Sequence, residues 1–187
     1  NRLGEMGDMK IIGNASPKYG YSFGGSFTYK GLSLYMMFQG IGKMDYSPYS
    51  EEAFFWGSGA RAQIVVFKQH LDYWTPDNPD AYYPNPYTAA VGGIKSLLAK
   101  TTTNSDRYLL NAAYLRLKNV TLSYVLPARV IDKIRFKQLR VFVSAENLFT
   151  ITQLAGMLDP EMLKGGLQPG KLYPLTKVNS IGINLTL

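Results

Sequence analysis

A strict two-residue alternation in residues 19–29 limits the fold of this chain more than any other feature. The odd positions carry aromatic rings or glycine, and the even positions carry only Gly, Ser or Thr. Successive side chains of a strand point to opposite faces, so this run predicts a strand with one aromatic face and one small, polar face. The alternation resumes at 32–40. A connection as short as Lys30-Gly31 predicts a β-hairpin in which Gly31 supplies a positive φ.

Three later runs, 114–126, 137–147 and 176–187, also alternate. Within the first of them the apolar positions change phase near Lys118-Asn119, which predicts a β-bulge that adds one residue to the strand. No run predicts an amphipathic helix longer than a turn or two. The prediction is an all-β chain of five antiparallel strands, at about 19–29, 32–40, 114–126, 137–147 and 176–187.

The length of the predicted strands and of their connections favours a membrane barrel. Strands of soluble sheets usually have about 5–6 residues, whereas transmembrane barrel strands have about 9–11. Short connections at 30–31 and 127–136 alternate with long loops at 41–113 and 148–175, as in bacterial outer-membrane barrels. Because such barrels need at least about eight strands, five strands predict a segment of a longer polypeptide. A soluble antiparallel sandwich remains the alternative.

The charge does not favour nucleic acid as a partner. The formal net charge is +7, but most Lys and Arg residues are spread singly along the chain. The densest basic stretch, 129–140, surrounds a predicted turn, where cations usually face solvent. We therefore expect no nucleic-acid partner.

No motif predicts catalysis, a cofactor or a metal. The chain has no Cys and a single His, His70, with no Gly-x-Ser-x-Gly elbow to accompany it. The acids Asp72, Asp77 and Asp80 do not have the spacing of an EF-hand calcium loop. We expect a protein that is not an enzyme and that binds no metal through these residues.

Four segments, in this order, resemble the C-terminal part of the SusC/RagA family of TonB-dependent outer-membrane transporters of the Bacteroidetes. They are Trp74-Thr75-Pro76-Asp77-Asn78-Pro79, residues 114–127, residues 139–150 with Asn147-Leu148-Phe149-Thr150 at the end, and residues 182–187. The resemblance implies a barrel of the 22-stranded type, of which residues 1–187 form the last five strands with long extracellular loops. It also implies that the N-terminal plug lies outside this chain.

The resemblance further implies a function and partners. Family members import nutrients such as oligosaccharides or peptides across the outer membrane, together with a SusD-like surface lipoprotein, and they contact the TonB complex through the N-terminal part. Two alternatives stay open: a soluble β-sandwich that binds carbohydrate, and an outer-membrane barrel with an adhesive or structural role.

The last predicted strand resembles the assembly signal of outer-membrane barrels, which generally has the order polar–x–Gly–x–x–apolar–x–aromatic. The matching residues are Ser180, Gly182, Leu185 and Leu187. The final position departs from the signal, since it holds Leu in place of an aromatic ring.

Aromatic residues of the loop 41–113 are the candidates for contact with substrate or with the lipoprotein lid, since rigid rings stack well on sugars and peptide side chains. The alternative, which the length of the loop favours, is that these rings pack the loop against itself. The candidates are Phe54, Phe55, Trp56, Trp74, Tyr82, Tyr83 and Tyr87.

Charged residues of the predicted strands are the candidates for the barrel lumen. If Leu139 and Val141 face outer-membrane lipid, their polar neighbours face inward, and Val141→Arg should impair assembly more than Arg140→Ala. The lumen candidates are Arg116, Lys118, Arg140 and Glu146.

Overall fold

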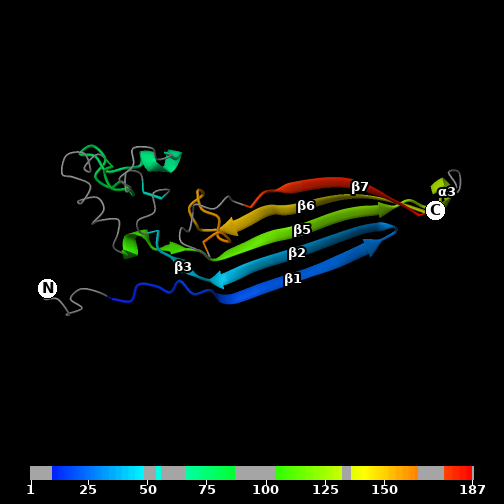
Figure 1. Ribbon diagram of the computed structural model, residues 1–187, viewed down its shortest axis with the longest axis horizontal. Helices are drawn as coiled ribbons and strands as arrows, with labels where there is room; N and C mark the ends of the chain where they lie inside the picture. Colours follow the sequence, from blue (N-terminus) through cyan, green and yellow to red (C-terminus); the bar gives the residue numbers. More distant parts are fainter. Residues whose placement is uncertain are drawn as a thin grey trace. The chain divides into compact units, whose positions relative to one another are not determined.

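The computed structural model describes residues 10–48, 54–55, 66–86, 104–131, 136–163 and 175–186. Five antiparallel strands form one sheet in the spatial order β1-β2-β5-β6-β7 (Figure 1). Their bounds are Lys18–Tyr29 for β1, Leu32–Lys43 for β2, Tyr114–Val125 for β5, Gln138–Thr152 for β6 and Val178–Thr186 for β7. The predicted all-β class and five-stranded antiparallel sheet are confirmed.

The remaining described elements are short. Strands β3 (Asp45–Tyr46) and β4 (Leu110–Asn111) pair with each other, and the helical turns are η1 (Lys68–Leu71), η2 (Asp106–Tyr108) and α3 (Ala128–Ile131). No helix in the described part of the chain is long and apolar enough to cross a membrane.

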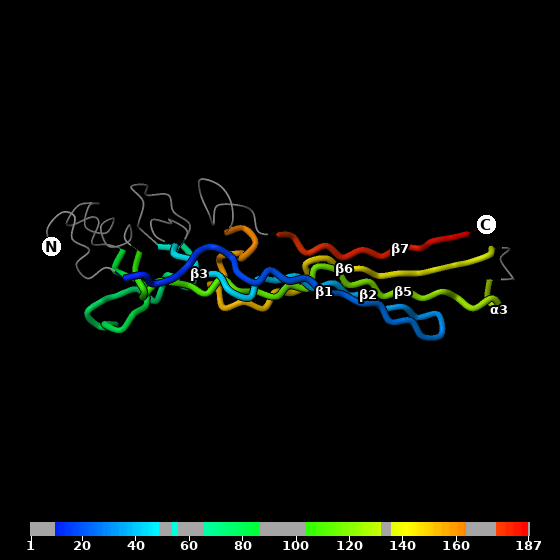
Figure 2. Tube along the Cα trace, turned by 90° about the horizontal axis from the view of Figure 1, so that it is seen from below, coloured from blue at the N-terminus to red at the C-terminus, as the bar shows by residue number. Residues whose placement is uncertain are grey.

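The chain divides into two compact units. The sheet unit comprises Pro17–Lys43, Ala112–Gln153 and Pro174–Leu187, and the loop unit comprises Asn1–Ser16, Met44–Asn111 and Leu154–Tyr173. In the sheet unit the five strands form a single layer, whose traces run beside one another in Figure 2. Within the sheet unit the described strands belong to this one sheet.

The predicted hairpin between β1 and β2 is present. Tyr29 pairs with Leu32, and both residues of the turn have a positive φ, 46° at Lys30 and 88° at Gly31. Two positive φ values define the type I′ turn, whose twist matches that of the flanking strands. The turn residues therefore fix the register of the hairpin.

The predicted bulge in β5 is also present. Met37 of β2 pairs with Asn119, whereas the next residue, Phe38, pairs with Leu117. Lys118 is therefore the additional residue, and it returns the apolar residues on either side of it to the same face.

Two strands extend past their predicted ends by three or more residues. Strand β2 continues to Lys43 and β6 continues to Thr152, beyond the predicted ends at 40 and 147. In β6 a second irregularity occurs at Asn147, which has a φ of 51°. Pairing with β5 then resumes at Phe149.

Candidate functional site

The register of the strands gathers apolar side chains on one face of the sheet. Cross-strand pairs join one row across all five strands, in the order Phe27, Leu34, Leu122, Val143 and Ile181. Although these residues are large and apolar, Phe27 is 68% exposed and Ile181 is 79% exposed. Soluble monomers rarely expose so extensive a contiguous apolar patch, so this face is built to be covered.

The opposite face carries small and polar side chains. The adjacent row, in the same order of strands, is Ser26, Tyr35, Thr121, Ser144 and Ser180. The two faces therefore differ in polarity along these two rows, as the alternation in the sequence predicts.

Three of the four lumen candidates lie on this polar face. Arg116 is buried, and its Nε donates a hydrogen bond of 2.7 Å to Thr150 Oγ1 of β6. Arg140 Nη2 donates a 2.9 Å bond to Ser123 Oγ. Glu146 pairs with Asn119 across the strands, whereas the fourth candidate, Lys118, is the additional residue of the bulge.

Two glycines of the sheet lie beneath aromatic rings. A Cβ on Gly40 would lie 2.6 Å from the Tyr21 hydroxyl oxygen, and that hydroxyl donates a 3.0 Å hydrogen bond to the carbonyl of Tyr114. The Phe142 ring covers Gly182 on the opposite face in the same way. Only glycine leaves room for such a ring, so the close approach of the ring to the backbone requires glycine at both positions.

The residues of the suggested assembly signal follow the same division. Ser180 and Gly182 lie on the polar face and Leu185 lies on the apolar face, opposite Leu139. Leu187 lies outside the described residues.

The loop unit has its own aromatic core. Phe54 and Phe55 meet edge to face at 4.8 Å between ring centroids, and Tyr83 lies 5.5 Å from Phe54. Tyr108 lies 4.8 Å from Phe55 and 5.4 Å from Tyr82. Edge-to-face pairs at these distances stabilise a cluster beyond the burial of area.

Burial separates the aromatic candidates into two groups. Phe54, Phe55 and Tyr83 are buried in this core, with Phe54 fully buried. Tyr82 is half-buried, and Trp74 is 42% exposed. Trp56 and Tyr87 lie outside the described residues. Of the described candidates, Trp74 and Tyr82 therefore offer the most surface to a ligand.

The ring of His70 bonds two backbone groups of the loop core. Its ring is fully buried, and its Nδ1 accepts a 3.1 Å hydrogen bond from the Phe67 N–H. An accepting Nδ1 leaves the proton on Nε2, which donates to the carbonyl of Phe54 at 3.0 Å. Both ring nitrogens thus bond backbone groups of the loop.

A turn holds Trp74 in place. The N–H of Asn78 donates to the carbonyl of Thr75 at 3.0 Å, which closes a turn with Pro76 at its second position. The Trp74 N–H donates to the carbonyl of Tyr83 at 2.9 Å. The Trp74 ring is therefore presented by a backbone that is fixed on both sides.

Asp72 has a structural position in the same turn. Its carboxylate accepts 3.2 Å hydrogen bonds from Asn78 Nδ2 and from the Tyr82 N–H. Among the described residues no group of three or more His, Cys, Asp or Glu side chains is placed to hold a metal ion.

Burial also changes the acidity of two phenols. Loss of solvent raises the pKa of Tyr83 to about 12, with a smaller contribution from Tyr82 and further contributions from Asp72 and Tyr108. Burial likewise raises the pKa of Tyr82, with Tyr108 adding to the rise and Arg107 opposing it. Both phenols are therefore neutral at physiological pH and act as donors or apolar surfaces.

The sequence analysis missed two residues that complete the cluster. Arg107 Nη2 donates to the carbonyl of Ala81 at 2.6 Å, and the Tyr108 hydroxyl donates to the carbonyl of Tyr82 at 3.1 Å. These partners lie 26 residues apart in the chain, so no local spacing indicates the contact.

The chain resembles TonB-dependent receptors in sequence. It is 28% identical, over 95% of its length, to TonB-dependent receptor P3 of Formosa agariphila, and 25% identical, over 96%, to TonB-dependent receptor P26 of the same organism. The fold agrees with structures of the RagAB peptide importer. In the open-open state the TM-score is 0.65 at 28% identity over 95% of this chain, and in the closed-closed state it is 0.63 at 30% over 94%.

The resemblance to the SusC/RagA family of TonB-dependent transporters is confirmed. No family model matches the chain. The chain spans 17% and 18% of the two Formosa receptors and 18% of each RagAB chain.

Proposed function

We propose that this chain contributes five adjacent strands to the β-barrel of a TonB-dependent importer of nutrients in the bacterial outer membrane. The observation that carries this proposal is the single-layer sheet with one continuous, exposed apolar face and one polar face. A face built in this way fits lipid on the outside of a barrel and water in the lumen. Similarity to the TonB-dependent receptors supports the same assignment.

The proposed domain assignment places the whole of residues 1–187 in the C-terminal part of a barrel of the 22-stranded type. The plug and the TonB-contacting segment then belong to other parts of the parent polypeptide. In this arrangement Arg116, Arg140 and Glu146 face the lumen. We propose no catalytic role, since the proteins that this chain resembles are named for reception and import.

The proposed substrate is a peptide or an oligosaccharide, delivered with the help of a SusD-like lipoprotein. Similarity to the RagAB peptide importer favours the peptide. Within the loop unit, Trp74 and Tyr82 are the proposed contacts with substrate or lid, because their rings retain exposed surface on a fixed turn.

The test of the barrel proposal uses an antibody raised against this chain. The parent polypeptide should be found in the outer-membrane fraction, with a denatured mass several times the 20.9 kDa of this chain. An unheated sample should migrate differently from a heated one, as closed barrels do. A soluble species near 20.9 kDa would contradict the proposal and would favour a binding module.

The test of the contact residues uses Trp74→Ala and Tyr82→Ala in the parent protein, with Leu71→Ala as the control. Leu71 is 64% exposed and lies in the same unit. Uptake of a labelled peptide should fall in the first two variants and not in the control. Equal uptake in all three variants would show that these two rings do not contact the substrate during import.

A further inference from the structure

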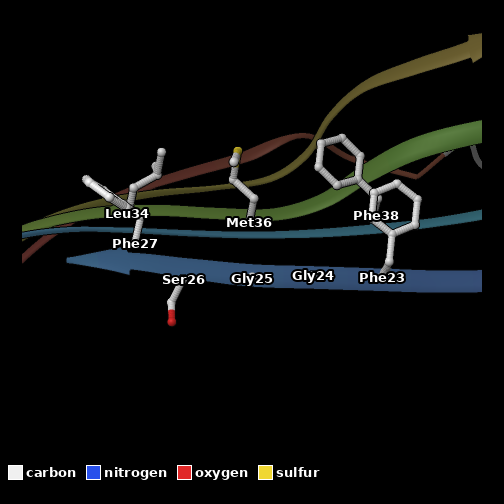
Figure 3. Close-up of a pocket in the computed structure, with 8 residues that line it drawn as sticks. All are labelled: Phe23, Gly24, Gly25, Ser26, Phe27, Leu34, Met36 and Phe38. Carbon is white, nitrogen blue, oxygen red and sulfur yellow. The ribbon is translucent and has the colours of Figure 1, made fainter.

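A groove interrupts the apolar face of the sheet at the β1–β2 hairpin. It lies over Gly25 and beside Met36, its cross-strand partner, between two pairs of larger side chains, and has a volume of about 340 Å³. Figure 3 shows Phe27 with Leu34 at one end and Phe23 with Phe38 at the other, while Ser26 points away to the opposite face. The groove is therefore walled by apolar groups and has a glycine as its floor.

The glycine is the reason that the groove exists. A Cβ at Gly25 would meet no atom within 4 Å, so the position has room for a side chain that the sequence does not supply. At one end the Phe23 and Phe38 rings stack with their centroids 5.1 Å apart. At about 30 Å³ for a group the size of a water molecule, the volume of the groove corresponds to roughly eleven such groups.

A cation stands at the turn end of the same hairpin. The Nζ of Lys30 lies 5.2 Å from the centroid of the Tyr29 ring, and that ring belongs to the apolar face. Arg129 of α3 and Lys137 are exposed at the same end of the sheet, where Val125 of β5 bonds the carbonyl of Gly31. Aromatic rings and cations at the end of an apolar band are typical of the membrane interface.

The distance between cation and groove matches one lipid leaflet. Gly25 lies five residues from Lys30, which corresponds to about 16 Å along a strand and to about 12 Å of depth at a tilt of ~45°. One leaflet of hydrocarbon is about 15 Å thick. An acyl chain whose headgroup lies at Lys30 would therefore reach the groove within its own leaflet.

We propose that the β1–β2 hairpin binds one anionic phospholipid on the outer face of the barrel, with its acyl chain in the groove over Gly25 and its phosphate at Lys30. This inference rests on the proposed function, because it requires the apolar face to lie in a bilayer. It adds to that function a specific lipid site at a defined hairpin.

The test uses the parent protein reconstituted in vesicles of phosphatidylcholine with a small fraction of phosphatidylglycerol that carries a photoreactive acyl chain. Illumination should label residues of the 19–38 segment. Gly25→Leu fills the groove and should reduce this labelling several-fold. The matched control is Gly20→Leu, since a Cβ at Gly20 also meets nothing within 4 Å but lies on the polar face.

The headgroup contact is tested separately with Lys30→Gln. One cation near an anionic surface contributes about 1 kcal/mol, so the preference for phosphatidylglycerol over phosphatidylcholine should fall about five-fold. This variant leaves the groove intact, and phosphatidylcholine carries no net charge, so labelling by a photoreactive phosphatidylcholine should fall less than labelling by phosphatidylglycerol.

Two results would overturn the inference in different ways. Equal labelling of the wild type and of Gly25→Leu, when both proteins migrate differently before and after heating as folded barrels do, would refute the lipid site. The proposal of an importer would then still stand. If the wild-type protein neither inserts in the bilayer nor migrates differently before and after heating, the proposed function is refuted, and the lipid site with it.

Discussion

A pair of arginine substitutions at adjacent residues of β6 tests the assignment of the two faces. Val143 lies on the apolar face between Leu122 and Ile181, and Ser144 lies on the polar face between Thr121 and Ser180. Val143→Arg and Ser144→Arg introduce the same side chain one residue apart. Any effect of size or charge on the strand itself is therefore shared, and the difference reports the environment of each face.

The structure sets the expected magnitude. Val143 lies five residues after Gln138, the first residue of β6, which places it about 12 Å into a band about 25 Å tall at a tilt of ~45°. This is close to the midplane, where an outward Arg costs about 2–4 kcal/mol. A substitution at Val141, nearer the strand end, should cost less. Ser144→Arg should cost little, because its guanidinium remains in water.

The assay is the fraction of the parent protein that folds to the heat-shifted form in vesicles across a urea series. Val143→Arg should lower the free energy of unfolding by about 2–4 kcal/mol, and Ser144→Arg by less than about 1 kcal/mol. Equal losses for the two variants, or a larger loss for Ser144→Arg, would refute the facing of this strand.

Three further predictions concern the loop unit and the sheet glycines. Phe54→Ala should open a cavity in the aromatic core and destabilise the loop unit by about 3–5 kcal/mol, seen as faster proteolysis of that unit in the folded parent protein. Burial raises the pKa of Tyr83 from 10.0 to about 12, so the stability that the neutral phenol contributes is complete below pH 10 and is lost as the pH rises to 12. Absorbance at 295 nm should show late-titrating phenols, and Tyr83→Phe should reduce the absorbance change at the highest pH. Gly40→Ala should block assembly, because its Cβ would collide with a neighbouring Tyr ring, whereas Gly20→Ala should assemble normally; equal yields of heat-shifted barrel would contradict this reading.

The strands could be predicted from the sequence because their signals are local. The two-residue connection Lys30-Gly31 indicates the turn type, and the change of phase at Lys118 indicates the bulge. Each signal depends on residues only a few positions apart in the chain. Alternation also gives the division of the faces, which places Arg116 and Arg140 on the polar side.

The strand ends and the loop core could not be predicted in the same way. Strand β6 continues past Asn147 because that residue adopts a left-handed conformation and lets pairing resume, which no alternation indicates. The contact of Tyr108 with Tyr82 joins residues far apart in the chain, so it depends on the tertiary fold. The burial of Phe54 also depends on the tertiary fold. The sequence of an aromatic-rich loop does not indicate which of its rings are buried in the core.

The most direct test of the account is a nitroxide scan of β5, residues 114–125, in the parent protein reconstituted in vesicles. The chain itself has no Cys, so within these 187 residues a label attaches only at the Cys that is introduced. Collision with dissolved oxygen, which partitions into lipid, should be high at 115 and 117, then change phase across Lys118 and be high at 120, 122 and 124. Collision with a water-soluble nickel complex should show the opposite pattern. High nickel collision at 120, 122 and 124 would contradict a lipid-facing apolar side, and with it the barrel.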